Sequence, residues 1–181
     1  AEERKKENLK KQFDNNEDTL AELSTILDRR IGDLGELFGV FRQTTDDTQA
    51  LLFDSLVTLE YPDRREDIDE LAGSSEVPTI PQLQDLWRLL MHEINYSGEI
   101  SKFKSEVVAP QGTTYEAEVT RVGTFNLVTD DKYLGYLSEE IKATELPRQP
   151  VGYARASAQD LGSAGIGDEA VTFAIDPSRG A

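Results

Sequence analysis

The feature that most constrains the fold of this chain is an apolar residue that returns every seven positions near its N-terminus. The row is formed by Phe13, Leu20, Leu27, Leu34 and Phe41. A companion row lies three positions further along each heptad. Leu23 and Leu37 continue this companion row, whereas Asn16 and Arg30 interrupt it. Such a pattern is typical of a helix that packs against another helix, so it predicts a coiled-coil-type helix.

The predicted helix is long. No proline occurs before Pro62, and a second apolar group with spacings of three and four residues follows the heptads. This second group consists of Leu51, Leu52, Leu56 and Leu59. A helix from Glu3 to Glu60 would span about 85 Å at 1.5 Å per residue. Because one small core cannot cover that length, we expect residues 1–60 to project from the rest of the chain or to pair with another helix.

Three glycines interrupt the good helix formers of this segment. Each of Gly32, Gly35 and Gly39 costs about 1 kcal/mol relative to alanine in a helix interior. Gly35 and Gly39 lie four positions apart and share a face, which would allow another backbone to approach closely. A weak point or bend in the helix is the alternative, and both interpretations stay open. The residues predicted to mediate helix pairing and close approach are Leu20, Leu23, Leu27, Leu34, Gly35, Phe38 and Gly39.

Residues 61–97 are predicted to form a helical return. The Tyr61-Pro62 step ends the long helix, and a short charged helix is expected from residue 63 to 71. The prolines at 78 and 81 mark the start of an amphipathic helix that contains Trp87. We expect this amphipathic helix to fold back antiparallel on the long helix, with Trp87 in the shared core.

From residue 98 the hydrophobic period changes from helical to two. Strands are predicted at 100–107, 115–122, 124–128, 132–137 and 171–175, with a short helix at 153–161. Turn signals at residues 110–112, 123 and 129–131 separate the strands. Helices followed by strands predict an α+β fold, in which residues 98–181 form an antiparallel β-rich domain.

The charge balance restricts the partners that this chain can bind. Its 35 acidic and 19 basic residues give a formal net charge of −16. Nucleic acid and anionic membrane surfaces require clusters of lysine and arginine, so both are predicted not to be partners. Residues 1–12 are the exception, since five basic and three acidic residues give them a net charge of +2, which leaves −18 for residues 13–181. The acidic surplus favours basic protein surfaces.

The sequence offers no recognisable catalytic, metal or cofactor site. It contains no cysteine and a single histidine, His92, so a zinc site would depend mainly on carboxylates. No phosphate-binding loop, dinucleotide fingerprint or nucleophile elbow is present. Adjacent acidic pairs such as Glu139-Glu140 occur in contexts typical of solvated surfaces. The chain is therefore predicted not to be an enzyme and to need no cofactor.

Several short strings in order resemble one protein family over roughly residues 30–181. They are GDLGELFGVFR at 32–42, YPDR at 61–64, SEVPTI at 75–80, VTRVGTF at 119–125, YL at 133–134, RQP at 148–150 and DPSRG at 176–180. Together they are similar to the N-terminal periplasmic region of long ExbB-like proteins, the TtpC type, in the MotA/TolQ/ExbB proton-channel family. The resemblance implies that transmembrane segments carrying the channel domain follow this region.

The resemblance also implies a function. Such proteins assist TonB-dependent uptake across the outer membrane, typically of iron–siderophore complexes, and their partners are TonB, ExbB, ExbD-type proteins and other periplasmic components. We therefore expect a periplasmic interaction module of an inner-membrane protein of a Gram-negative bacterium, anchored by segments outside this chain. Homo-oligomerisation stays open. The alternative is a structural coiled-coil scaffold unrelated to transport, because it would show the same heptads.

Overall fold

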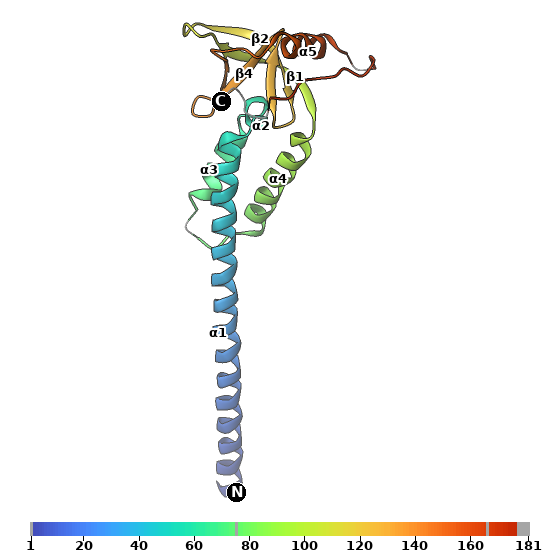
Figure 1. Cartoon of the computed structure of the whole chain (residues 1–181). Helices are drawn as coiled ribbons and strands as arrows, with labels where there is room; N and C mark the ends of the chain where they lie inside the picture. The colour runs from blue at the N-terminus through green and yellow to red at the C-terminus, as the bar shows by residue number, and fades with distance from the viewer. Residues whose placement is uncertain (1, 75, 166, 177–181) are drawn as a thin grey trace.

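A computed structural model of the chain describes residues 2–74, 76–165 and 167–176 and has an α+β architecture, as the sequence predicts. A long helix, α1 (Glu2–Asp54), projects from a small body that contains the other elements (Figure 1). Of the family-like strings, Ser75 and most of the last, from residue 177 onward, lie outside the described residues. We call residues 4–40 of α1 the stalk.

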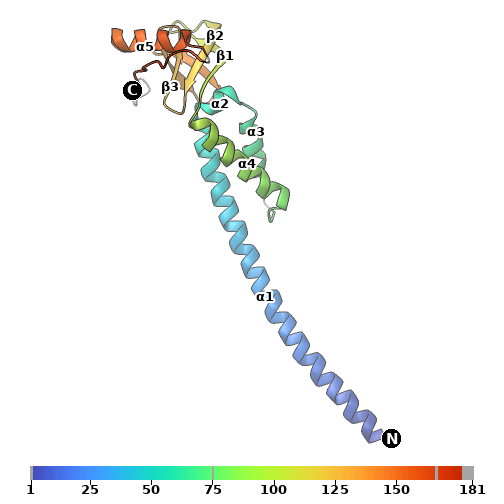
Figure 2. The same cartoon turned by 90° about the vertical axis from the view of Figure 1, so that its right-hand side faces the viewer.

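The helix α1 runs without interruption through all three glycines of the stalk. It ends at Asp54 rather than at Glu60, and a short helix, α2 (Val57–Glu60), follows. The hydroxyl of Ser55 accepts a hydrogen bond from the backbone N–H of Val57 at the step between the two helices. At 1.5 Å per residue the 53 residues of α1 extend for about 80 Å. Figure 2 shows that most of this length lies beyond the body.

Two further helices pack on the last turns of α1. They are α3 (Arg64–Ala72) and α4 (Ile80–Ser97), and Thr79 begins α4 with a capping box formed with Gln82. With α1 they form the base core, whose buried residues are Phe41, Leu52, Ile68, Leu71, Leu86 and Leu89.

The direction of α4 differs from the prediction. The short helix α3 runs antiparallel to α1, and α4 returns toward the body in the same direction as α1 (Figures 1 and 2). Both α1 and the first strand meet the body at the same end of this helical layer. The chain between them must therefore lead away from the barrel and return to it, and it does so with two helices, α3 and α4, rather than one.

Within the body, five strands form a small closed barrel. They are β1 (Ile100–Val108), β2 (Thr114–Val122), β3 (Asn126–Thr129), β4 (Lys132–Leu137) and β5 (Lys142–Glu145). Consecutive strands pair antiparallel, but β1 and β5 close the barrel as a parallel pair through Val107 with Ala143 and Val108 with Thr144. The predicted antiparallel meander is therefore present in β1 to β5, and the parallel pair of β1 with β5, which was not predicted, makes the sheet mixed.

The segment that follows the stalk helix fills one part of the barrel. Leu56 and Leu59, at α2, are buried together with residues from all five strands. This barrel core consists of Leu56, Leu59, Val107, Val119, Leu127, Leu134 and Ala143. Because α2 follows directly from α1, the stalk is joined to the barrel through an apolar plug.

The outer face of β3 and β4 is covered by α5 (Gly152–Ser163), close to the predicted helix at 153–161. The predicted strand at 171–175 is wrong, because this segment makes no strand ladder. Side chains bind its backbone instead: Asn126 forms two hydrogen bonds with Asp176, and Ser157 accepts one from the N–H of Ala174. A closed barrel offers no free edge on which a sixth strand could form.

Candidate functional site

The apolar row of the stalk is exposed along its length. Leu20 is 68% exposed and Leu27 is 58% exposed, although both are large apolar side chains. The same holds for Leu9, Phe13, Leu23, Leu34 and Leu37. The four predicted leucines, Leu20, Leu23, Leu27 and Leu34, thus lie together in one stripe on one helix, and the described part of the chain does not cover them. Exposed apolar surface of this extent is unusual on a monomeric protein, so the stripe is a candidate binding surface.

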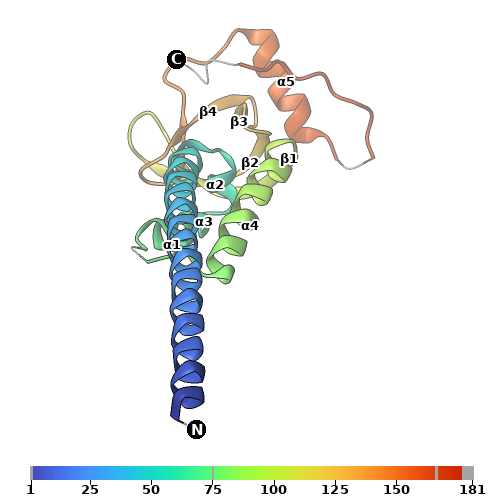
Figure 3. The ribbon, with the colours of Figure 1, turned by 90° about the horizontal axis from the view of Figure 1, so that it is seen from below.

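The stripe continues the helix face that the base core already covers. Phe41, Thr45, Thr48 and Leu52 are buried at spacings of three and four residues on that face. The two buried threonines satisfy their hydroxyls locally, since Thr45 donates to the carbonyl of Phe41 at 2.8 Å and Thr48 to that of Thr44 at 2.6 Å. The side chain of Phe38 is half-buried at the boundary. Helices α3 and α4 therefore cover this face near the barrel, whereas its side chains toward the N-terminus are exposed; Figure 3 shows α3 and α4 beside the end of α1 that joins the barrel.

The stalk glycines pack against no other element among the described residues. A Cβ atom added at Gly32, Gly35 or Gly39 would meet nothing within 4 Å. Close packing of these glycines within the chain is therefore not observed, and their proposed use in close approach applies to a partner. With 100° per residue, Gly35 and Gly39 lie to one side of the stripe rather than on its centre.

Replacing Gly39 by alanine is expected to stabilise the helix by about 1 kcal/mol, because the new methyl group meets open space and the flexible residue is removed. Thermal unfolding followed by circular dichroism at 222 nm measures the effect. The matched control is Gly112→Ala, which also adds a methyl group in open space but forces alanine to φ +86°. Equal or lower stability of Gly39→Ala than of Gly112→Ala would contradict this account of the stalk.

A second exposed apolar row lies on α4. Ile80, Trp87 and Ile94 follow each other at intervals of seven residues, and Trp87 is 62% exposed. The prediction that Trp87 lies in the core was therefore wrong. Leu86 and Leu89 take the core positions instead, because they lie on the side of α4 that faces α1 and α3. The seven-residue interval between Ile80, Trp87 and Ile94 is the signal in the sequence that could have identified this row as a separate face.

Buried charges join α2, which follows the long helix, to the barrel and to α4. Arg121 is fully buried, and its guanidinium donates to a carboxylate oxygen of Glu60 at 2.8 and 3.0 Å and to the carbonyls of Tyr96 at 2.7 Å and Gly123 at 3.0 Å. Ser101 donates to the same carboxylate at 2.7 Å. A buried arginine with this many acceptors fixes α2, α4 and β2 in one arrangement.

A second buried pair lies inside the helical base. Arg64 forms an ion pair with Glu93, and the hydroxyl of Ser55 donates to Glu93 at 2.7 Å. At the outer side Ser138 donates to Asp54 at 3.0 Å. These contacts hold the end of α1 to α4 on one side and to the barrel on the other, so the stalk is mounted on a fixed base.

His92 lies in a stack of rings rather than among metal ligands. Its ring centroid is 4.1 Å from that of Tyr96 and 4.7 Å from that of Tyr61. Burial, with the nearby Arg64 guanidinium, lowers the pKa of His92 below 6.5, and burial raises the pKa of Tyr61 to about 12. The described residues contain no group of three or more side chains suited to holding a metal ion.

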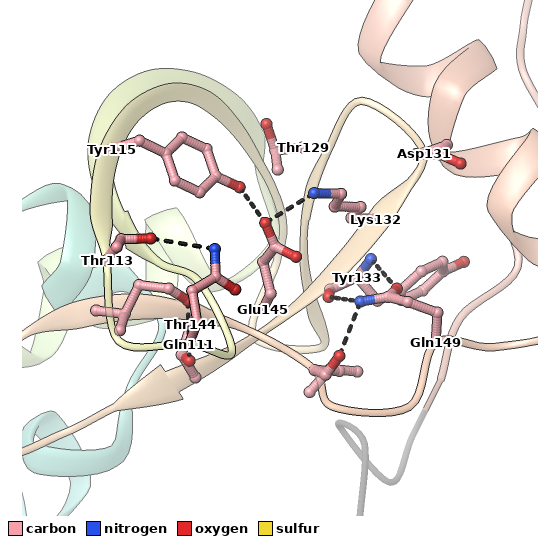
Figure 4. A network of polar contacts seen from close by, with 12 residues as sticks. Gln111, Thr113, Tyr115, Thr129, Asp131, Lys132, Tyr133, Thr144, Glu145 and Gln149 are labelled. Carbon is pink, nitrogen blue, oxygen red and sulfur yellow. Dashed lines mark hydrogen bonds and ion pairs between the residues drawn. The ribbon is translucent and has the colours of Figure 1, made fainter.

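A network of polar side chains on the barrel surface is held by hydrogen bonds among its own members (Figure 4). Glu145 accepts hydrogen bonds from Tyr115 at 2.6 Å and from Lys132 at 2.7 Å, and these contacts lower the pKa of the carboxyl. Burial and the Glu145 carboxylate raise the pKa of Tyr115 to about 12. The amide of Gln149 bonds both backbone groups of Tyr133, as a strand would. These contacts hold β2, β4 and β5 together, and the polar groups of Glu145 and Gln149 are used in structural hydrogen bonds.

None of the helices in the described ranges combines the length and apolar character that a bilayer crossing requires. Comparison of the chain with models of known families, with characterised proteins and with solved structures finds no match. The family resemblance in the sequence therefore stays an expectation, and the exposed stripe is the candidate functional site.

Proposed function

We propose that this chain is a protein-interaction module that binds the helix of a partner along the exposed stripe of its stalk. The observation that carries the proposal is the row of leucines between Leu20 and Leu34, which stays exposed on a helix that the body holds at one end only. Water contact with such a row is unfavourable by about 25 cal/mol per Å² of apolar surface, so covering it favours association.

The partner that fits has an apolar helix face flanked by basic residues. Residues 13–181 carry a net charge of −18, which steers basic surfaces toward the chain and disfavours acidic ones. Consistent with the sequence resemblance, we propose that the partners are periplasmic parts of a TonB system, such as TonB and ExbD-type proteins. In that setting the module links an ExbB/TolQ-like component of the inner membrane to energy transduction for outer-membrane transport.

The test replaces Leu20 and Leu27 by aspartate together. Two charges in the centre of the stripe are expected to abolish binding to the periplasmic domains of TonB and ExbD-type proteins, measured by biolayer interferometry. The base core and barrel contain neither residue, so the thermal unfolding transition of the body should persist.

The matched control is Asn15→Asp with Thr25→Asp. It adds the same two charges on exposed positions that lie on the opposite face of the stalk. Wild-type binding with this control and loss of binding with the leucine variant supports the proposal. Undiminished binding by the leucine variant rules the stripe out as the binding surface.

A further inference from the structure

The bare stripe and the covered face at the base belong to one continuous side of α1. Helices α3 and α4 pack on this side from Phe41 to Leu52, and the stripe occupies it from Leu37 back to Leu9. Any helix that covers the stripe must therefore end where α3 and α4 begin. This boundary decides which orientation a second stalk can adopt.

Two stalks cannot pair in parallel and in register over their full stripes. The stripes would face each other, so each copy's own α3 and α4 would lie between the two α1 helices at the base. Packed helices are about 8–10 Å apart, so two intervening layers would hold the α1 axes about 30 Å apart there. Pairing at Leu34 and Leu37 would then be lost. The same register also places Arg30 opposite Arg30 in the seam, where like charges repel.

We infer that the stripe of one stalk is covered by the stalk of a second copy in antiparallel orientation, with Leu9 opposite Leu34 and Leu20 opposite Leu23 of the second copy. This inference rests on the same stripe as the proposed function and names a second occupant for it, which competes with the partner helix. Residues 5–38 of the two copies overlap, and both α3–α4 pairs lie outside the overlap.

The antiparallel register covers the exposed apolar side chains and also places the polar interruptions. Leu9, Phe13, Leu20, Leu23, Leu27 and Leu34 all enter the seam. Arg30 lies opposite Phe13, whose ring face can bind a guanidinium. Asn16 of each copy lies opposite Leu27 of the other, so the dimer contains two such layers, one on each side of its centre. No like-charged pair occupies a core layer.

Charge favours the same arrangement. Residues 4–11 contain five basic side chains and one acidic one, and the segment 32–39 that lies opposite contains two acidic and no basic residues. Residues 55–181 contain 22 acidic and 11 basic residues, a net charge of −11 for each body. The antiparallel register places Phe41 of the two copies about 60 Å apart along the helix axis. This separation far exceeds the screening length of about 8 Å, so the acidic bodies do not repel each other. Parallel pairing would bring the two bodies together.

The test exploits the absence of native cysteine, since any disulfide must come from introduced residues. Leu9→Cys chains are mixed with Leu34→Cys chains that carry a tag of different mass, and the mixture is oxidised mildly. In the antiparallel dimer the two thiols are opposite each other, whereas Leu9 lies about 37 Å from Leu9 of the second copy. The control mixture pairs Leu9→Cys with Thr25→Cys, which lies away from the seam.

The expected result is a disulfide between the two tagged species in the first mixture, none in the control, and a dimer mass for the unmodified chain by light scattering. Disulfides within the Leu9→Cys or Leu34→Cys population alone would show parallel pairing and overturn the inference. A monomer at 100 µM without cross-links would also overturn it. Partner binding without self-pairing refutes this inference and leaves the proposed function, whereas self-pairing without partner binding refutes the proposed function alone.

Discussion

Replacement of Arg121 by methionine is expected to lower the free energy of unfolding by about 3–5 kcal/mol. The guanidinium is fully buried and is the donor for Glu60 and for the carbonyls of Tyr96 and Gly123. Methionine fills a similar length but donates nothing. The Glu60 carboxylate then keeps the hydroxyl of Ser101 but loses its charged partner, and the carbonyls of Tyr96 and Gly123 each lose one donor.

Chemical denaturation measured by circular dichroism tests this prediction against two controls. The double variant Arg121→Met with Glu60→Met removes both charges and is expected to recover much of the loss, since the cost comes from the unpaired charge. Arg88→Met breaks the exposed pair with Asp85 and is expected to change stability by less than about 1 kcal/mol. If Arg121→Met cost no more than Arg88→Met, the buried pair would not hold the body together.

The stalk was the part of the fold that the sequence predicted best, because its information is local. A heptad row, good helix formers and the absence of proline determine a helix regardless of what surrounds it. The same row predicted the stripe, and its exposure follows from length alone. The boundary at Phe41, where the stripe becomes core, was not predicted, because it depends on α3 and α4 packing there.

The barrel was predicted strand by strand but not as a barrel. Strand β1 alternates with period two, and β2, β3 and β4 are strand-like runs bounded by turn residues. By contrast, β5 is four residues long and largely polar, and only its Ala143 belongs to the barrel core. Its existence depends on pairing with both β4 and β1, which are distant in the sequence. The segment 171–175 has the pattern of a strand but no free sheet edge to join. The local sequence pattern therefore missed one strand, β5, and predicted another, at 171–175, that does not form.

The residues of the candidate site and its support also divide into those that the sequence predicted and those that it did not. The leucines of the stripe were identified from spacing, and Trp87 was misplaced because an aromatic residue on an amphipathic helix is usually core. The buried arginine was not identified, since an arginine within a strand pattern gives no sign of burial. Its three acceptor atoms come from α2, α4 and the turn after β2, which only the fold brings together.

Replacement of Leu56 by alanine is expected to lower the free energy of unfolding by about 2–5 kcal/mol. Leu56 is 2% exposed and lies in the barrel core beside Leu59 and residues from all five strands. Removing its branched end leaves a cavity where α2 enters the barrel. Because α2 directly follows α1, the lost packing should destabilise the attachment of α1 to the barrel as well as the barrel itself.

The matched control is Leu27→Ala, the same chemical change on the exposed stripe. It removes no packing within the chain, so the body should unfold at the same denaturant concentration as in the unmodified protein. Hydrogen exchange separates the two effects further: Leu56→Ala should raise exchange in β1 and β2 and in the last turns of α1 together, whereas Leu27→Ala should leave the strands unchanged. If exchange rose in the strands alone, the plug would stabilise the barrel without coupling it to the stalk.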